Sequence, residues 1–252
     1  MTLFDLDGRK ALVAGGAGDL GRAMVSALAQ AGVEVAVVDV AAGLEAWVDT
    51  LRQPGLAVVH AIRADFADRV DLGRGFEAAL RVLGTVDILL NAQGIQRRFP
   101  AEDFPLNVWD EVIEVNLTSV FAMCQLAGRV MLARQYGKII NIASMQSFTG
   151  GLTIPAYAAS KAGVAQITKA LANEWTGRGV TVNAIAPGYM DTKMTAAVKA
   201  DPVRYGRILA RIPAGRWGQP EDLCGPLLFL AAPASDYVSG VILPVDGGML
   251  GT

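Results

Sequence analysis

The stretch KALVAGGAGDLG, residues 10–21, joins a short apolar segment to a glycine-rich turn. Gly16, Gly18 and Gly21 match the pattern G-x-G-x-x-G, and the turn leads into a helical pattern, LGRAMVSALAQAG, at 20–32. Glycines in such a turn let backbone N–H groups approach a pyrophosphate, and the N-terminus of the following helix favours that anion. The stretch therefore predicts the start of a βαβ unit that binds a dinucleotide.

The alternation of strand and helix patterns continues to the end of the chain. Nearly continuous apolar runs, typical of parallel strands buried on both faces, lie at 10–15, 33–40, 57–62, 86–91, 138–144, 180–187 and 241–246. Amphipathic stretches separate them at 20–31, 67–83, 106–134, 156–178 and 220–232. This order predicts an α/β fold in a single Rossmann-type domain over 1–252, with a seven-stranded parallel sheet and helices on both faces.

The segment around 189–219 departs from this alternation. It follows the sixth predicted strand, and we expect it to form one or two short helices. Because ligands of open α/β sheets bind beyond the carboxyl ends of the strands, the segment is a candidate substrate lid. An ordinary surface excursion is the alternative.

Composition excludes several classes of function. Of the 252 residues, 52% are hydrophobic and 18% are charged, and the formal net charge is −2 without a block of like charges, so we expect no nucleic-acid or membrane-surface partner. The start, MTLFDLDGRK, lacks a signal-peptide pattern, and no apolar run reaches the ~20 residues that span a bilayer. Cys124 and Cys224 make no disulfide framework, which favours a cytoplasmic location. His60 is the only histidine, so we expect neither a His-based triad nor a multi-histidine metal site.

Asp39 bears on the choice of cofactor. It ends the second predicted strand, 18 residues after Gly21, where a carboxylate can accept hydrogen bonds from both ribose hydroxyls of NAD. The same carboxylate would repel a 2′-phosphate, and the next residues, Val40, Ala41 and Ala42, offer no positive charge. The sequence therefore favours NAD over NADP. A plain turn residue at the strand end is the alternative.

Tyr157 and Lys161 lie four residues apart in the helical pattern PAYAASKAGVAQITKALANEW. Positions i and i+4 share one face of a helix, so the spacing places a phenol beside an ammonium group. A neighbouring positive charge stabilises the phenolate, which would let the tyrosine exchange a proton with a substrate oxygen near neutral pH. Such a pair also occurs by chance, with the tyrosine merely packing on the lysine stem.

With these motifs in order, the chain resembles the short-chain dehydrogenase/reductase family over essentially its whole length. The matching residues are the glycine turn at 15–21, Asp65-Phe66, Asn91-Ala92-Gln93-Gly94, Asn116, Ser144, Tyr157, Lys161, Pro187-Gly188, Thr192 and the end PVDGG at 244–248. Ser144 precedes Tyr157 by thirteen residues, as it does in the family.

The resemblance implies a catalytic set. In it, Tyr157 is the general acid/base, and Lys161 lowers the pKa of Tyr157 and holds the nicotinamide ribose. Ser144 donates a hydrogen bond to the substrate oxygen, and Asn116 supports Lys161 through a water. The ordinary alternatives are a strand-end turn residue for Ser144 and a polar group inside a helix for Asn116. The implied cofactor contacts are Gly15, Gly18, Asp19, Leu20, Gly21, Asp39, Asp65, Phe66, Asn91, Ala92, Gly94, Tyr157, Lys161, Pro187, Gly188, Met190 and Thr192.

Three positions depart from the family's pattern. Ala14 stands where the family usually has Thr, Asp19 where it has Gly, and Gln93 where it has a small residue. We expect Asp19 to cap the helix that begins at Leu20, and it brings a negative charge near the expected pyrophosphate.

Within the family, the chain resembles dehydrogenases of gluconate and deoxy-gluconates. The stretches that carry this resemblance are GIQRRFP (94–100), NIASMQSF (141–148), IAPGYM (185–190), RIPAGRWGQPEDL (211–223) and VDGGML (245–250). A sugar acid needs a cation for its carboxylate, and Arg97, Arg98, Arg211 and Arg216 are available, with Arg98 the first choice. We expect the substrate contacts to be Ser144, Gln146, Tyr157, Tyr189 and Arg98.

Other functions remain open at this point. A 3-oxoacyl-carrier-protein reductase, or another alcohol or steroid dehydrogenase of the family, is one alternative. A non-catalytic dinucleotide-binding protein is a more remote one. The family resemblance also implies a homotetramer, for which the long apolar helical patterns at 106–134 and 156–178 could supply the interfaces.

Overall fold

One seven-stranded sheet runs through the molecule in the order β3-β2-β1-β4-β5-β6-β7, and every neighbouring pair is parallel. The computed structural model describes residues 2–251. The strands are β1 (Lys10–Ala14), β2 (Glu34–Asp39), β3 (Val59–Arg63), β4 (Ile88–Asn91), β5 (Gly137–Ile142), β6 (Val180–Pro187) and β7 (Ile242–Val245). β1 lies in the middle of the sheet. β2 and β3 follow on one side of it, and β4 to β7 follow on the other side, so the strand order switches sides between β1 and β4. Ligands of such sheets bind at this switch point.

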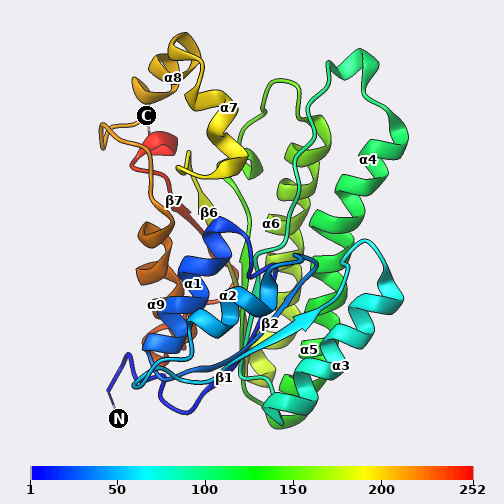
Figure 1. The fold of residues 1–252 in the computed structure, drawn as a ribbon, viewed down its shortest axis with the longest axis vertical. Coiled ribbons are helices and arrows are strands. Elements are labelled where there is room, and N and C mark those ends of the chain that lie inside the picture. Colours follow the sequence, from blue (N-terminus) through cyan, green and yellow to red (C-terminus); the bar gives the residue numbers. More distant parts are fainter. Residues whose placement is uncertain (1, 252) are drawn as a thin grey trace.

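Helices cover both faces of the sheet (Figure 1), so the predicted fold class is confirmed. The helices α1 (Asp19–Gln30), α2 (Leu44–Thr50) and α9 (Cys224–Ala231) pack on one face. The helices α3 (Arg69–Leu83), α5 (Ser119–Arg134) and α6 (Pro155–Trp175) pack on the other.

The pleat of each strand explains why the strand sequences are apolar throughout. In β1, Leu12 and Ala14 belong to the core under α3, α5 and α6, whereas Ala11 and Val13 belong to the core under α1 and α9. Successive side chains of a strand point to opposite faces, and both faces are covered here. The four buried residues of the strand, 11–14, are therefore all apolar.

The segment predicted as one helix over 106–134 contains a local defect. It is built from α4 (Leu106–Ile113), a π-helical turn at Glu114–Thr118, and α5. By length and composition alone, this 29-residue run is long and apolar enough to cross a membrane, with a mean hydropathy of 1.3 and 44% of its apolar window buried. Its inner side chains, such as Met123 and Ala127, lie in the core. The run is therefore a partly buried core helix.

The segment after β6 lies at the top left of the molecule in Figure 1. It contains a 3₁₀ turn at Lys193–Thr195, α7 (Ala196–Lys199) and α8 (Pro202–Leu209), as the prediction of short helices required. A small apolar cluster of its own, which includes Val198, Ile208 and Trp217, joins it to Met145 and Met249. These contacts hold the segment over the carboxyl ends of β5 and β6.

Candidate active site

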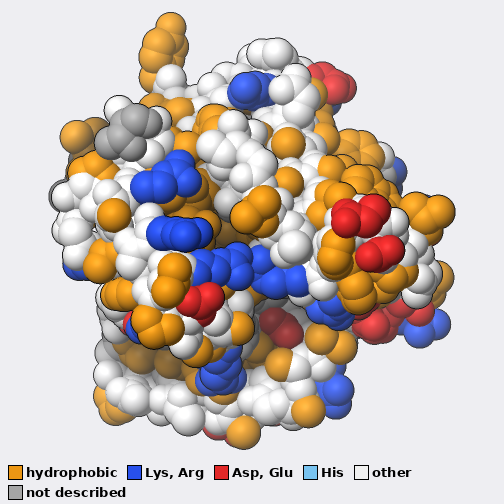
Figure 2. Space-filling view, turned by 90° about the horizontal axis from the view of Figure 1, so that it is seen from above, with side chains coloured by type: hydrophobic (Ala, Val, Ile, Leu, Met, Phe, Trp, Pro, Cys, Tyr) orange, Lys and Arg blue, Asp and Glu red, His pale blue; other side chains and the backbone are white. Residues whose placement is uncertain are grey.

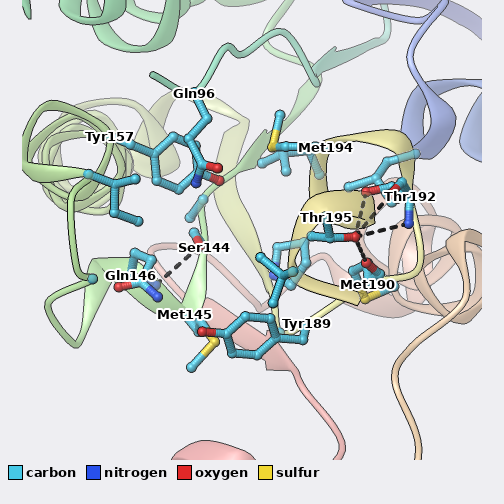
Figure 3. A pocket seen from close by; sticks show the side chains of 18 of the residues that line it. Gln96, Ser144, Met145, Gln146, Tyr157, Tyr189, Met190, Thr192, Met194 and Thr195 are labelled. Atoms are coloured by element: carbon cyan, nitrogen blue, oxygen red, sulfur yellow. Dashed lines mark hydrogen bonds between the residues drawn. The ribbon is translucent and has the colours of Figure 1, made fainter. Parts of the chain in front are cut away.

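A cavity lies between the carboxyl ends of β5 and β6 and the segment that carries α7 and α8. It holds about 780 Å³ of empty space, part of it open to solvent. Figure 3 shows Tyr157, Gln96 and Ser144 on one side of it and Tyr189, Met194 and Thr195 on the other.

Tyr157 and Lys161 occupy successive turns of α6, with Lys161 Nζ 5.8 Å from the centre of the Tyr157 ring. Lys161 is only 3% exposed, and its Nζ donates a hydrogen bond of 2.7 Å to the carbonyl oxygen of Ile142, the last residue of β5. Ser144 follows two residues later and lines the cavity together with Tyr157. Its Oγ accepts a 3.1 Å hydrogen bond from the backbone N–H of Gln146. The predicted serine, tyrosine and lysine are therefore brought together.

The pKa of Tyr157 differs from the expectation that Lys161 would lower it. Burial raises the pKa of Tyr157 above its ordinary value. A hydrogen bond with Ser144 and the charge of Arg98 act in the opposite direction but offset only part of this rise. Burial also lowers the pKa of Lys161 from its ordinary value of 10.5 to about 8, because the charged amine loses water. The groups that favour the phenolate here are therefore Ser144 and Arg98.

Asn116 lies in the π-helical turn and is fully buried. Its Oδ1 accepts a 2.8 Å hydrogen bond from the backbone N–H of Ile95, and its Nδ2 donates to Ile95 O at 2.9 Å and to Ser160 Oγ at 3.1 Å. The side chain thus ties the loop after β4 to α6. Turns of this kind within α-helices are frequent at functional sites.

Gly94 separates Asn116 from Lys161. A Cβ atom added to Gly94 would lie 3.5 Å from Asn116 Oδ1 and 3.5 Å from Lys161 Nζ. Both polar atoms therefore face the same point beside the loop after β4. This arrangement brings the fourth residue of the predicted catalytic set next to the lysine.

The glycine turn is closely packed except at Gly18. A Cβ atom on Gly15, whose φ is +77°, would come within 2.4 Å of the Gln93 backbone, and one on Gly21 within 2.5 Å of Gly15 O. The nearest atom to a Cβ on Gly18 would be 3.9 Å away. Gly18 is the N-cap of α1 and supplies no side-chain cap, so the first amides of this helix remain available to an anion.

Asp39 lies beside the same turn. Its Oδ2 accepts a 2.9 Å hydrogen bond from the N–H of Ala17, and its Oδ1 accepts one of 2.9 Å from the N–H of Ala41. A carboxylate has about four lone-pair sites, so each oxygen can accept a further hydrogen bond. The carboxylate is therefore held in place at the end of β2 with capacity left for a ligand.

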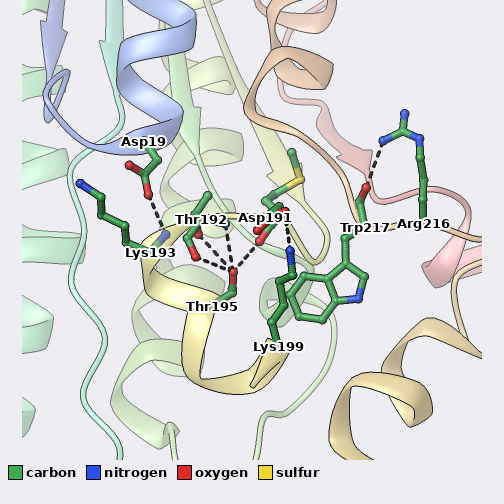
Figure 4. Close-up of polar contacts among 9 residues, drawn as sticks. Asp19, Asp191, Thr192, Lys193, Thr195, Lys199, Arg216 and Trp217 are labelled. Atoms are coloured by element: carbon green, nitrogen blue, oxygen red, sulfur yellow. Dashed lines mark hydrogen bonds and ion pairs between the residues drawn. The ribbon is translucent and has the colours of Figure 1, made fainter. Parts of the chain in front are cut away.

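Asp19 does not cap α1, which corrects the expectation from the sequence. It is the first residue of the helix rather than the residue before it. Its Oδ2 instead accepts a 2.7 Å hydrogen bond from the backbone N–H of Lys193, in the segment after β6 (Figure 4). The carboxylate thus connects the glycine turn to the 3₁₀ turn that precedes α7.

Two of the expected cofactor residues turn their side chains into the protein. Asn91 is 1% exposed, and its Nδ2 donates to Asn141 Oδ1 at 2.9 Å and to Cys124 Sγ at 3.3 Å. Phe66 is buried in the core under α3. Only the backbone of these two residues can face a cofactor. The Asp65 side chain is exposed and caps its own turn through the N–H of Ala67.

Other members of the expected cofactor set line the cavity itself. They are Leu20, Pro187, Gly188, Met190 and Thr192. The hydroxyl of Thr192 lies 3.3 Å from that of Thr195, whose Oγ1 donates to Met190 O at 2.6 Å. The cavity therefore extends from the catalytic set toward the glycine turn, as one continuous site for cofactor and substrate would require.

All five expected substrate residues, Ser144, Gln146, Tyr157, Tyr189 and Arg98, line this cavity. The other arginine candidates do not. The guanidinium groups of Arg97 and Arg216 pair with carboxylates, that of Arg97 with Glu111 at 2.7 Å and that of Arg216 with Asp222 at 2.7 and 2.9 Å. Arg211 lines a neighbouring pocket.

Several lining residues were not predicted from the sequence, and Arg204 is the most consequential of them. Arg204 belongs to α8 and lines both the cavity and the neighbouring pocket. Arg204 lies one helical turn before Ile208, and no pattern in the sequence set it apart from the other arginines of this segment. Gln96, Met145 and Met194 were missed as well.

Across residues 2–251, no group of three or more His, Cys, Asp or Glu side chains is placed to hold a metal ion.

Known proteins resemble this chain over nearly its whole length. A family model described as enoyl-(acyl carrier protein) reductase matches residues 15–250. The 2-dehydro-3-deoxy-D-gluconate 5-dehydrogenase of Bacillus subtilis is 46% identical over 98% of this chain and 96% of its own length. A Beutenbergia cavernae protein solved with NADP at low occupancy has a TM-score of 0.95 and 45% identity, with complete coverage of both chains.

The structure of a gluconate 5-dehydrogenase from Burkholderia cenocepacia in complex with NADP and tartrate is also similar. Its TM-score is 0.94 and its identity 37%, over 99% of this chain and 98% of the other. These matches agree with the ordered motifs and with the fold. The chain belongs to the short-chain dehydrogenase/reductase family, and it is an oxidoreductase that acts on CH–OH groups with a nicotinamide dinucleotide cofactor.

Proposed function

We propose that this enzyme interconverts a secondary alcohol and a ketone on a sugar acid of the gluconate or deoxy-gluconate type, with NAD as its cofactor. One observation carries the proposal. Ser144 and Tyr157 line a cavity whose charged lining residues are Arg98 and Arg204. Proton-exchanging hydroxyl groups and cations in one cavity suit a hydroxy acid, and the names of the relatives support that class of substrate.

The glycine turn suits the dinucleotide. Gly15 and Gly21 are packed against backbone, whereas Gly18 leaves open space at the N-terminus of α1. We assign the pyrophosphate to these amides and the adenine end to Asp39, Asp65 and the backbone of Phe66. The nicotinamide end lies toward the residues after β4 and β6. When bound, a nicotinamide cofactor accepts or supplies the hydride.

Tyr157 moves the proton in this proposal. During oxidation its phenolate oxygen takes the proton of the substrate hydroxyl, and during reduction the phenol returns it. Ser144 donates a hydrogen bond to the same substrate oxygen and holds it in place. Lys161 holds the nicotinamide ribose, and Asn116 faces Lys161 across Gly94, where a water could relay the proton outward.

The preference for NAD rests on Asp39. Its carboxylate is fixed by two backbone N–H groups, and no lysine or arginine occurs at 40–42 to receive a 2′-phosphate. Similar proteins have been solved with NADP, so activity is compared with both cofactors. In the variant Asp39→Ala, we expect the ratio of kcat/KM for NAD to that for NADP to fall by about tenfold or more, because hydrogen bonds to a charged acceptor are lost.

Further parts of the proposal concern the organisation of the protein. We propose one dinucleotide-binding and catalytic domain over 1–252, with residues 189–219 as a substrate lid. Gln146 and Tyr189 hold substrate hydroxyls. The two cysteines are free, which suits a cytoplasmic location. We also propose a homotetramer.

A panel of substrates tests this function. Production of NADH and NADPH is measured with sugar acids, neutral polyols, secondary alcohols, steroids and 3-hydroxyacyl thioesters. We expect turnover with gluconate or a deoxy-gluconate and NAD. Turnover of acyl thioesters or steroids in preference to sugar acids would overturn the substrate class. Tight NAD binding without turnover of any substrate would indicate a non-catalytic protein.

A further inference from the structure

The charge of the candidate cavity is carried by two arginines. Its lining, which lies wholly within the described chain, contains Arg98 and Arg204 and no lysine, aspartate or glutamate. Tyr157 and Tyr189 lie in the same lining, so the two guanidinium groups share the cavity with the proton-exchanging phenol. A small, partly enclosed space with two positive charges and no negative one favours an anion.

Neither arginine has a carboxylate partner among residues 2–251. Arg98 donates one long hydrogen bond, of 3.4 Å, to the carbonyl oxygen of Leu152. Loss of water lowers the pKa of Arg98, and the positive charge of Arg204 lowers it further, which places the two groups within electrostatic reach of each other. Two like charges held together without a counter-charge destabilise each other, and a bound anion would remove that cost.

Arg204 comes from a different part of the fold than Arg98. Arg98 follows β4, whereas Arg204 lies in the first turn of α8, within the segment proposed as a lid. The backbone N–H of Arg204 is bonded to Asp201 Oδ1 at 3.1 Å, which fixes the start of α8. One anion that contacts both guanidinium groups would therefore bridge the body of the protein and the lid.

We propose that Arg204 determines specificity by holding, together with Arg98, the carboxylate of the substrate. This inference rests on the proposed function, in which the substrate is a sugar acid. Arginine matches a carboxylate with two parallel hydrogen bonds, so two arginines can engage both carboxylate oxygens. With the carboxylate held there, the hydroxyl to be oxidised is directed toward Ser144 and Tyr157. A neutral polyol of the same length lacks this anchor.

The same helix offers a matched control. Arg207 is an exposed arginine of α8 that lines only the neighbouring pocket, beside Arg211 and Val203. Replacement of Arg207 removes the same charge from the same helix without touching the cavity (Figure 2 shows the Lys and Arg side chains gathered beside a hollow at this end of the molecule). A general effect of positive charge on an anionic ligand would appear in both variants.

The test is calorimetric binding of D-gluconate and of D-glucitol to the enzyme saturated with NADH. Both ligand and cofactor are then in the reduced form, so no turnover occurs. We expect wild type to prefer gluconate, Arg204→Ala to lose about 10- to 100-fold of gluconate affinity, and glucitol affinity to change by less than about threefold, since hydrogen bonds to a charged group are lost only with the acid. Arg207→Ala should change neither affinity by more than about threefold.

Arg204→Lys is the conservative variant, and we expect it to bind gluconate with an affinity between those of wild type and Arg204→Ala, because lysine keeps the charge without the planar fork. Equal losses for gluconate and glucitol in Arg204→Ala, or equal losses in Arg204→Ala and Arg207→Ala, would overturn the proposal. Absence of a gluconate preference in wild type would also overturn it. Binding is read without turnover, so a failure of the proposed activity is recognised separately, in the substrate panel.

Discussion

At the scale of single residues, Tyr157 carries the sharpest prediction. Tyr157→Phe keeps the ring in its place on α6 and removes only the hydroxyl that faces the cavity. General acid/base groups typically contribute about 10²- to 10⁴-fold to a rate, so we expect kcat to fall by about that factor while the dissociation constant for NADH stays nearly constant. Steady-state rates and fluorescence titration with NADH measure the two quantities.

Tyr205→Phe is the matched control for that variant. The Tyr205 ring stacks on Trp217, with ring centres 5.4 Å apart, and does not line the cavity. We expect this variant to turn over at close to the wild-type rate. A Tyr157→Phe variant with a comparable rate would show that another group moves the proton.

Lys161 gives a prediction about stability and pH. Its pKa is lowered from 10.5 to about 8 in the folded protein, so between these values the unfolded chain binds the proton that the folded chain has released. Stability rises with pH wherever the unfolded state binds more protons, so this contribution is complete above about 10.5 and is lost as the pH falls toward about 8. We expect the free energy of unfolding of wild type, relative to Lys161→Met, to rise by on the order of 3 kcal/mol across this window.

Urea unfolding of both proteins at pH 7.5, 9 and 10.5 measures this difference. Lys169→Met is the control, because Lys169 lies on the same helix and is exposed. Its difference from wild type should not depend on pH. A constant difference for Lys161→Met as well would mean that the buried amine keeps its ordinary pKa.

Residue identities could be predicted from the sequence, but side-chain directions could not. The motif around Asn91 and the Asp65-Phe66 step were found by their order in the chain. Whether Asn91 faces the cofactor or Asn141 depends on which face of the sheet its side chain meets at the end of β4. That choice is made by packing across the sheet, between residues that are distant in sequence.

At the scale of elements, helices and strands were predicted where their pattern was regular and missed where they were short. The five inner strands are almost wholly buried and read as continuous apolar runs, and the two edge strands, β3 and β7, were found by similar but less buried apolar runs. α2 was missed although Leu44 and Val48, its buried residues, are spaced as on one helix face. The π-helical turn that aims Asn116 leaves no mark in a sequence that is apolar on both sides of it, so 106–134 reads as one helix.

A hydrogen bond from the proposed lid to Asp19 connects the lid to the start of α1. The Asp19 carboxylate, at the start of α1, accepts the N–H of Lys193 at 2.7 Å. We expect Asp19→Ala to speed amide hydrogen exchange at Lys193 by about tenfold or more, because a hydrogen bond to a charged acceptor is lost. Exchange followed by mass spectrometry on peptides that cover 190–199 measures this.

Asp191→Ala is the control for the lid. Asp191 pairs with Lys199 inside the same segment and makes no contact with α1 through that pair (Figure 4). We expect exchange at Lys193 to stay within about threefold of wild type in this variant. Equal acceleration by both substitutions would mean that the segment opens as a whole, without a specific contact to the glycine turn.

At the scale of the whole molecule, the sequence predicted the sheet and many of the residues that line the cavity, but not the wall that α8 supplies. The switch point between β1 and β4 follows from the order of the strands, and the catalytic set follows from motifs. Arg204 lines the cavity because α8 lies over the carboxyl ends of β5 and β6. The position of α8 depends on contacts between residues distant in sequence, so no local sequence pattern predicts it. The part of the site that the sequence leaves open is therefore the wall that α8 supplies.

The last prediction concerns assembly. Phe121 is 43% exposed on the outer side of α5, within the long helical run whose apolar window is only 44% buried. A second copy of this chain packed against α5 would bury that surface, as the proposed homotetramer requires. We expect sedimentation velocity to give a tetramer for wild type and smaller species for Phe121→Glu, because a buried unpaired carboxylate destabilises an interface. Val58→Glu, at an exposed position before the edge strand β3, should leave the tetramer intact. A monomeric wild type would contradict the tetramer, and a tetrameric Phe121→Glu would place its interfaces elsewhere.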